Sequence, residues 1–175
     1  MTETDLPLLV VVTGPPAAGK TTVAHALADE LRLPLVARDD LKETLFGSLG
    51  WSDRDWSRRL GAAAYDLLFL VLAELLRRGV SAISESNFSN VEPLQALPPH
   101  RTVQIFCTAP VELLLERYAG RPRHPGHVDE VTIAEVAPRI RAGEWRPLAL
   151  DGPLLELDTS RPVDLPALAA AILRA

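Results

Sequence analysis

Residues 8–22, LLVVVTGPPAAGKTT, carry the most informative pattern in this 175-residue chain. An apolar run is followed by an octapeptide, residues 14–21, with the Gly-x-x-x-x-Gly-Lys-Thr pattern of a phosphate-binding loop. Gly14 leaves the strand in a turn that a side chain would obstruct, and Gly19 lets the backbone approach an oxygen closely. Residues 22–33 then carry apolar side chains at helical spacing. This strand, loop and helix predict a site that binds a polyphosphate.

The loop supplies its own donors for that anion. Amides at a helix N-terminus converge on phosphates, where the helix dipole also favours negative charge. Pro15 and Pro16 donate nothing, so the later amides must form the cradle. Lys20 would reach the β- and γ-phosphates, and the Thr21 hydroxyl would ligate Mg²⁺. The predicted nucleotide-binding residues of the loop are Gly14, Ala17, Ala18, Gly19, Lys20, Thr21 and Thr22.

Composition limits the classes of protein that fit. With 47% hydrophobic residues, the chain should form one domain over residues 1–175. No apolar run is long enough for a membrane span, and the acidic N-terminus lacks signal-peptide order, so we expect no membrane association. The single cysteine, Cys107, fits a cytoplasmic protein. A net charge of −5 disfavours a nucleic-acid partner without excluding a local basic groove.

Strand and helix patterns alternate along the chain, which predicts an α/β fold with a parallel sheet covered on both faces. In such a sheet the ligand site lies beyond the carboxyl ends of the strands. We expect strands at residues 8–13, 35–37, 80–84, 102–108 and 154–158. We expect helices at residues 20–33, 40–46, 53–78, 111–118, 131–142 and 165–174.

Polar residues follow the second predicted strand. Asp39 is the better candidate for the general base, because it would face the γ-phosphate from the acceptor side. Asp40 is the alternative base, or else it caps the following helix. Arg38 and Lys42 could hold an anionic acceptor, although a solvated helix face would have the same composition.

Other acceptor-side candidates come from neighbouring segments. Glu85 ends the third strand in the manner of a Walker B acid, and could order the water shell of Mg²⁺ or position the acceptor. Asn87, beside it, could hydrogen-bond the substrate. Trp51 and Trp56 either line the acceptor pocket or pack in the core.

A cationic, Pro- and Gly-rich connection at about residues 119–130 predicts a mobile lid. Arg121 and Arg123, with Arg117 in the preceding helix, could stabilise the transferred group's charge when the lid closes. His124 and His127 have no complete ligand set around them in the sequence, and are interpreted as solvent-exposed lid residues.

The pairing of residues 14–22 with Arg38-Asp39-Asp40 resembles small P-loop kinases related to the 5′-kinase domain of polynucleotide kinase, chloramphenicol phosphotransferase and the zeta toxins. The resemblance runs from Val10 to about Ser160. It implies a three-layer sandwich with a five-stranded parallel sheet in the order 2-3-1-4-5, and Asp39 as the base. It also implies that residues 84–87 match the family's Ser-Asp-Thr-Asn segment, with Glu85 for Asp. Asp158 and Thr159 are similar to its adenine loop.

Loop, base and arginine lid together predict an ATP- and Mg²⁺-dependent phosphotransferase acting on a hydroxyl of a small molecule, whether metabolite, nucleoside or antibiotic. Two alternatives stay open. One is a 5′-hydroxyl polynucleotide kinase, and the other is a non-catalytic ATP-binding regulatory module.

Overall fold

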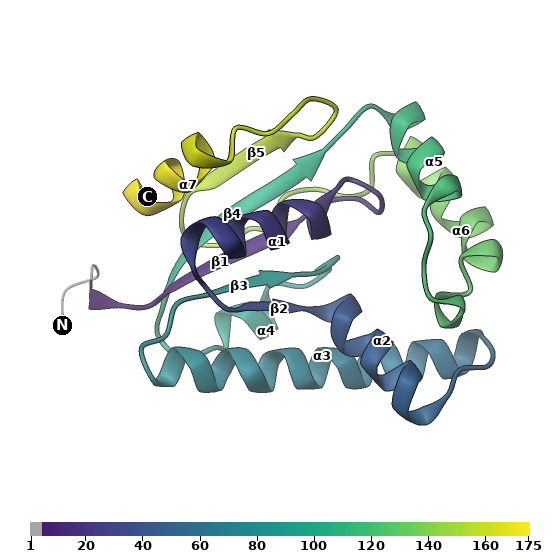
Figure 1. Ribbon diagram of the computed structural model, residues 1–175, viewed down its shortest axis with the longest axis horizontal. Coiled ribbons are helices and arrows are strands. Elements are labelled where there is room, and N and C mark those ends of the chain that lie inside the picture. The colour runs from purple at the N-terminus through teal and green to yellow at the C-terminus, as the bar shows by residue number, and fades with distance from the viewer. Residues whose placement is uncertain (1–4) are drawn as a thin grey trace.

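The chain folds as alternating strands and helices (Figure 1). The computed structural model describes residues 5–175, with the side chains of residues 129–131 left out. The strands are β1 (Leu8–Thr13), β2 (Leu35–Ala37), β3 (Ala82–Glu85), β4 (Arg101–Thr108) and β5 (Leu154–Asp158). The helices are α1 (Lys20–Leu31), α2 (Arg38–Leu49), α3 (Arg54–Arg77), α4 (Glu92–Gln95), α5 (Val111–Gly120), the 3-10 turn η2 (Pro125–His127), α6 (Asp129–Arg141) and α7 (Leu165–Arg174).

The five strands form one parallel sheet in the order β2-β3-β1-β4-β5, so the predicted order is confirmed. The register places Val12 of β1 opposite Glu85 of β3. Because residues 14–21 begin directly after β1, this pairing puts the Glu85 carboxylate beside the start of the phosphate loop.

Helices cover both faces of the sheet, which explains why every residue of β1 is buried. Leu8, Val10 and Val12 pack in one core cluster that includes residues of α1 and α7. Leu9 and Val11 point the other way, into a second cluster built with α3. Side chains alternate between the two faces of a strand, so a strand covered on both sides reads as a continuous apolar run.

The carboxyl ends of the strands face α2, α5 and α6, which stand together at that end of the sheet in Figure 1. The phosphate loop leaves β1 at the same end. Helix α3, with 24 residues, runs along one face of the sheet and packs against α2 (Figure 1). Within the described part of the chain, no helix combines the length and apolarity needed to cross a membrane.

Three local predictions were wrong. Helix α2 begins at Arg38 rather than at residue 40, and its N-cap is Ala37, so Asp40 does not cap it. Asp39 and Asp40 instead lie in the first turn, where the helix dipole favours carboxylates. Strand β3 begins at Ala82 rather than at residue 80, and Glu85 is its last residue. The four-residue helix α4 was not predicted, because one helical turn carries no periodic pattern.

Gly14→Ala is expected to lower the free energy of unfolding by about 3–5 kcal/mol, because overpacking and backbone strain would act together. Gly14 has a φ of 139°, and a Cβ there would lie 2.1 Å from the carbonyl oxygen of Cys107, a backbone atom that cannot move aside. Urea unfolding of the two proteins measures the difference.

Gly79→Ala is the matched control, since Gly79 also has positive φ, 72°, but has nothing within 4 Å of the position that a methyl group would take. It should cost about 1 kcal/mol from strain alone. Equal losses in the two variants would show that the contact with Cys107 has no energetic importance.

Candidate functional site

A cavity of about 1040 Å³ opens at the carboxyl ends of the strands. Its walls come from the phosphate loop, α1, α2, the end of β3, α5, residues 121–128 (the lid segment), α6 and the connection from β5 to α7. The predicted residues that line it are Ala17, Gly19, Lys20, Thr21, Thr22, Arg38, Asp39, Asp40, Lys42, Glu85, Asn87, Arg117, Arg121, Arg123 and Thr159. Tertiary structure therefore gathers side chains from segments far apart in the chain around one space.

The phosphate loop turns through left-handed backbone conformations. Ala17 has a φ of 63° and Gly19 a φ of 75°. The other two predicted loop residues, Gly14 and Ala18, are buried and do not line the cavity. These two residues therefore contribute to the site by shaping the course of the loop backbone rather than by facing the cavity.

Lys20 is the buried cation of this loop. Its Nζ donates to the carbonyl oxygen of Pro15 over 2.9 Å. Burial lowers the pKa of Lys20, while the nearby Glu85 carboxylate partly opposes that shift. A phosphate arriving in the loop would supply the anionic partner that a buried ammonium favours.

Thr21 and Glu85 meet at the base of the cavity. The Thr21 hydroxyl donates to Glu85 Oε2 over 3.3 Å, and Glu85 is 4% exposed. Burial raises the pKa of Glu85, and Asp39 adds to that rise while Lys20 opposes it. One hydroxyl and one carboxylate suit Mg²⁺, which keeps most of its waters and binds few protein ligands beside phosphates. A divalent cation there would offset the unfavourable burial of the carboxylate.

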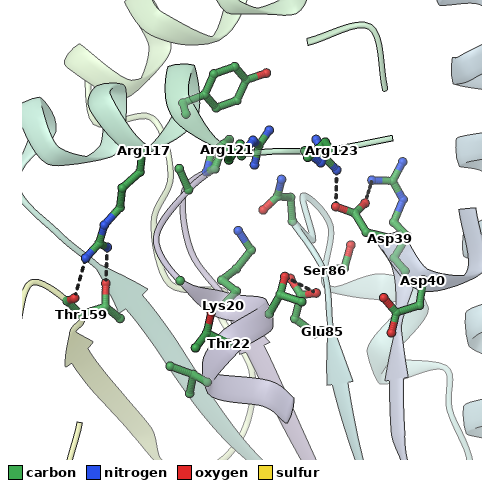
Figure 2. A pocket seen from close by; sticks show the side chains of 18 of the residues that line it. Lys20, Thr22, Asp39, Asp40, Glu85, Ser86, Arg117, Arg121, Arg123 and Thr159 are labelled. Atoms are coloured by element: carbon green, nitrogen blue, oxygen red, sulfur yellow. Dashed lines mark hydrogen bonds and ion pairs between the residues drawn. The ribbon is translucent and has the colours of Figure 1, made fainter. Parts of the chain in front are cut away.

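Asp39 lies across the cavity from the loop, in the first turn of α2. Arg123 donates to its Oδ2 in an ion pair, and Arg38 Nη1 lies 4.0 Å from its Oδ1 (Figure 2). Burial alone would raise the pKa of Asp39, but Arg123, His127, Arg38 and Lys20 outweigh that effect and the pKa is lowered. Asp39 is therefore a carboxylate at neutral pH, ready to accept a hydrogen bond or a proton.

The three predicted arginines have different positions along the cavity (Figure 2). Arg117 lies at one end and donates to the hydroxyl and carbonyl oxygens of Thr159, over 3.1 and 2.9 Å. Arg123 lies at the other end, on Asp39. Arg121 is between them, near enough to Lys20 to lower its pKa, with its guanidinium 4.2 Å from the Tyr118 ring centroid.

Near Arg38, α3 and the end of β3 carry polar contacts that the sequence did not identify. Tyr65, on α3, hydrogen-bonds Ser86 Oγ over 2.8 Å and donates to the Asn87 carbonyl oxygen over 3.1 Å. The Arg38 guanidinium lies 4.4 Å from the centroid of the Tyr65 ring. Tyr65 sits in the middle of a 24-residue helix, where nothing in the local pattern separates it from a core aromatic.

Lys42, which is also buried, donates from Nζ to Ser57 Oγ over 2.8 Å. The contact joins α2 to α3, so Lys42 both lines the cavity and connects its wall to the sheet-covering helix.

Three residues predicted to contact the acceptor or the nucleoside lie outside the cavity lining. Trp51 is half exposed and meets the His124 ring edge-on, with 6.1 Å between centroids. The Trp56 indole donates to the Gly50 carbonyl oxygen over 3.1 Å. Asp158 is exposed and accepts a hydrogen bond from the Ser160 amide over 2.9 Å. Hydrogen bonding to the Ser160 side chain, and then to its amide, lowers the pKa of Asp158. The two tryptophans flank the start of α3, and at the other end Thr159 rather than Asp158 faces the cavity.

The prediction that His127 is solvent-exposed was wrong. His127 is buried, and its Nε2 lies 2.8 Å from Glu43 Oε1 of α2. Burial lowers the pKa of His127 and Arg123 lowers it further, whereas Asp39 and Glu43 oppose the shift. His124 is half-buried and stacks on Phe46. The sequence carried no signal for this packing, because Phe46 and the two histidines come from segments far apart in the chain.

Comparison with known proteins identifies the family and the fold of the chain. A family model described as AAA domain matches residues 9–142. A crystal structure of a "putative kinase" from Chloroflexus aurantiacus J-10-fl is 42% identical, with a TM-score of 0.90 over 97% of this chain and 98% of that chain. No curated protein matches the sequence.

More distant structures share the fold alone. A sugar kinase from Janibacter sp. HTCC2649 is 20% identical, with a TM-score of 0.55 over 97% of this chain and 93% of its own. A chain of the Pnkp1/Rnl/Hen1 RNA repair complex is also 20% identical, with a TM-score of 0.53 over 79% of this chain and 45% of its own. With the family model covering most of the chain, the protein belongs to the AAA domain family and has the fold of its P-loop kinases.

Proposed function

We propose that this protein is a kinase that transfers the γ-phosphoryl group of ATP to a hydroxyl of a small polar molecule. The observation that carries the proposal is that Lys20, Asp39 and Arg121 border one cavity from three sides. Phosphoryl transfer requires a cradle for the phosphates, cations over the developing charge and a group that orients the nucleophile. The cavity offers all three.

The phosphate loop would bind the β- and γ-phosphates through its amides and Lys20. Arg121 approaches the same space from the lid, so it is the arginine best placed to stabilise charge on the transferred group. Thr21 and Glu85 would hold Mg²⁺, directly and through water. When bound, Mg²⁺ neutralises charge on the phosphate oxygens.

Asp39 would receive the proton of the acceptor hydroxyl. Its lowered pKa keeps it ionised, and its position on α2 lies opposite the loop. Arg38 and Arg123 flank the carboxylate and would orient it while the acceptor binds.

The lining of the cavity supports a polar acceptor. Besides Asp39, the cavity is lined by many charged or polar residues from α2, the end of β3 and the lid segment, namely Arg38, Asp40, Lys42, Glu43, Glu85, Ser86, Asn87, Arg121, Arg123 and His127. The apolar lining residues Val23, Val136, Val163 and Leu165 instead belong to the core cluster between α1 and α7. Polar groups left unpaired by an apolar ligand would oppose its binding, so we infer a hydroxyl-rich acceptor such as a sugar or polyol.

The other end of the cavity would hold the nucleoside. Thr159 connects that end to the loop, because its hydroxyl donates to the Ala18 carbonyl oxygen over 3.0 Å while it accepts from Arg117. Arg117 would therefore fix the wall that the nucleoside packs against rather than contact the transferred phosphate.

A mass-spectrometric screen tests the proposal. The purified protein is incubated with ATP, Mg²⁺ and panels of sugars, polyols, nucleosides, antibiotics and a 5′-hydroxyl oligonucleotide, with Lys20→Ala as the blank. A sugar or polyol that gains one phosphate, and does so only with the native protein, is the expected result.

Other outcomes of the screen have distinct meanings. Phosphorylation of the oligonucleotide alone would identify a polynucleotide kinase, and its binding should then weaken steeply with salt. If no compound gains a phosphate, and ATP instead changes association with a protein partner, the proposal is replaced by that of a regulatory module.

A further inference from the structure

The lid segment, residues 121–128, packs its two histidine rings on one aromatic side chain of α2, Phe46. Phe46 is 2% exposed. His124 stacks on its ring with 5.0 Å between centroids and an interplanar angle of 17°. His127 meets the same ring edge-on, with 5.4 Å between centroids. Phe46 is therefore enclosed by two rings from the lid.

Gly126 makes this contact sterically possible. A Cβ at Gly126 would lie 2.8 Å from two carbon atoms of the Phe46 ring, closer than real Cβ atoms approach a neighbour. The Gly126 amide donates to His124 Nδ1 over 3.1 Å, and His127 Nε2 lies 2.8 Å from Glu43 Oε1. We call Phe46, His124, Gly126 and His127 the latch.

The latch lies close to the proposed base along both segments that form it. Asp39 and Phe46 belong to the same helix, and Arg123 directly precedes His124. An ordered latch therefore fixes both partners of the ion pair between Arg123 and Asp39. A loop held only by surface charge would order its side chains less, because exposed ion pairs contribute little.

We infer that the latch is a positioning device that holds Arg123 against Asp39, so that Phe46 and Gly126, which touch no reacting group, set the geometry and basicity of the acceptor site. The expected effect of the latch on phosphoryl transfer rests on the proposed function. The placement of Arg123 against Asp39 does not, because it concerns the ligand-free protein.

The charges that act on Asp39 come from every element packed around it. Arg123 and His127 belong to the lid segment, Arg38 to α2 and Lys20 to the phosphate loop, and each lowers its pKa. Glu85, on β3, is the acidic neighbour. Moving the lid segment away removes Arg123 and His127 together, while the burial that raises the pKa remains in part. The pKa of Asp39 should then rise.

Gly126→Ala tests the inference. Carbon-13 NMR of the side-chain carboxyl groups in the ligand-free protein should give a higher pKa for Asp39 in the variant than in the native protein. In the transfer assay, the acid limb of the profile of kcat/KM against pH should move to higher pH. At neutral pH, kcat/KM should fall by about 10- to 100-fold, as misplaced groups in an active site commonly cause.

Two further variants separate positioning from folding. Gly47→Ala, on the same helix, has nothing within 4 Å of the new methyl group and should leave the Asp39 pKa unchanged. Phe46→Leu should raise the pKa of Asp39. This variant tests the inference by itself if Gly126→Ala fails to fold. In the double variant, the shift should be no larger than the larger single shift, because both changes break one contact.

The outcomes distinguish the two proposals. An unchanged Asp39 pKa in a folded latch variant, or additive shifts in the double variant, overturns the latch whatever the activity. A raised pKa in a protein that phosphorylates no acceptor supports the latch and refutes the proposed function.

Discussion

Asp39→Asn is expected to reduce phosphoryl transfer by about 10²- to 10⁴-fold, the usual contribution of a positioned general base. The amide has nearly the same shape as the carboxylate and still accepts a hydrogen bond from Arg123, so the lid segment should keep its place. It cannot take up the proton of the acceptor hydroxyl. The Kd for ATP, measured by calorimetry, should change little, because Asp39 faces the acceptor side of the cavity.

Asp40→Asn is the matched control for this experiment. Asp40 is the adjacent carboxylate, and it also lines the cavity, but its side chain is 57% exposed and pairs with His25 at 3.7 Å. An exposed pair of this kind contributes little. We expect transfer within a few-fold of the native rate. If Asp40→Asn loses the activity and Asp39→Asn keeps it, the assignment of the base is reversed.

The pH dependence of the native enzyme provides a second test of Asp39. Its folded pKa is lowered, so the carboxylate form persists to a pH below the ordinary value for aspartate. The acid limb of kcat/KM should therefore lie at low pH, and an acid limb above the ordinary pKa of aspartate would contradict the role of Asp39 as a base held ionised by Arg123.

Lys20→Met is expected to lower transfer by about 10²- to 10³-fold, in the range for the loss of one preorganised charge contact. The methionine keeps an unbranched apolar stem in a buried position but carries no charge to the β- and γ-phosphates. Unlike Asp39→Asn, this variant should also weaken ATP binding. Lys20→Arg is the control that keeps the charge. We expect it to lose activity as well, because the larger guanidinium does not fit the position of an ammonium that donates to the Pro15 carbonyl oxygen.

The stability of Lys20→Met should change in the opposite direction to its activity. Burial lowers the folded pKa of Lys20 below its unfolded value, so the native charge is unfavourable at all pH values below the folded pKa. This cost declines as pH rises from the folded pKa toward 10.5, the unfolded value. Removing the charge should therefore raise the Tm of the ligand-free protein at neutral pH, as measured by calorimetry. A lower Tm would show that the ammonium stabilises the loop even without phosphate.

Much of this architecture follows from local sequence patterns. The run Leu8–Val12 predicts a strand buried on both faces, and the strand has that environment because α1 and α3 cover its two sides. The Gly14–Thr21 pattern is equally local, because the backbone itself requires its glycines. Both glycines have positive φ, and a methyl group at Gly14 would lie 2.1 Å from a carbonyl oxygen. Alternation of strands and helices then predicts which strand ends share an edge.

The lid illustrates what local patterns leave open. Arginine density predicted a cationic lid, yet the three side chains diverge, with Arg117 on Thr159 and Arg123 on Asp39. Their directions depend on partners 42 and 84 residues away in sequence, which no window of local sequence contains. For the same reason His127 was expected in solvent, although Phe46 and Glu43 enclose it.

A phosphate loop on a parallel sheet can be predicted from the sequence, because those features depend on spacing, glycine geometry and apolar periodicity within short segments. Which charged side chain meets which cannot be predicted in this way. Side-chain pairing between segments far apart in the chain depends on how α2, α3 and the lid segment pack, and that packing is the sum of many contacts with no local signature.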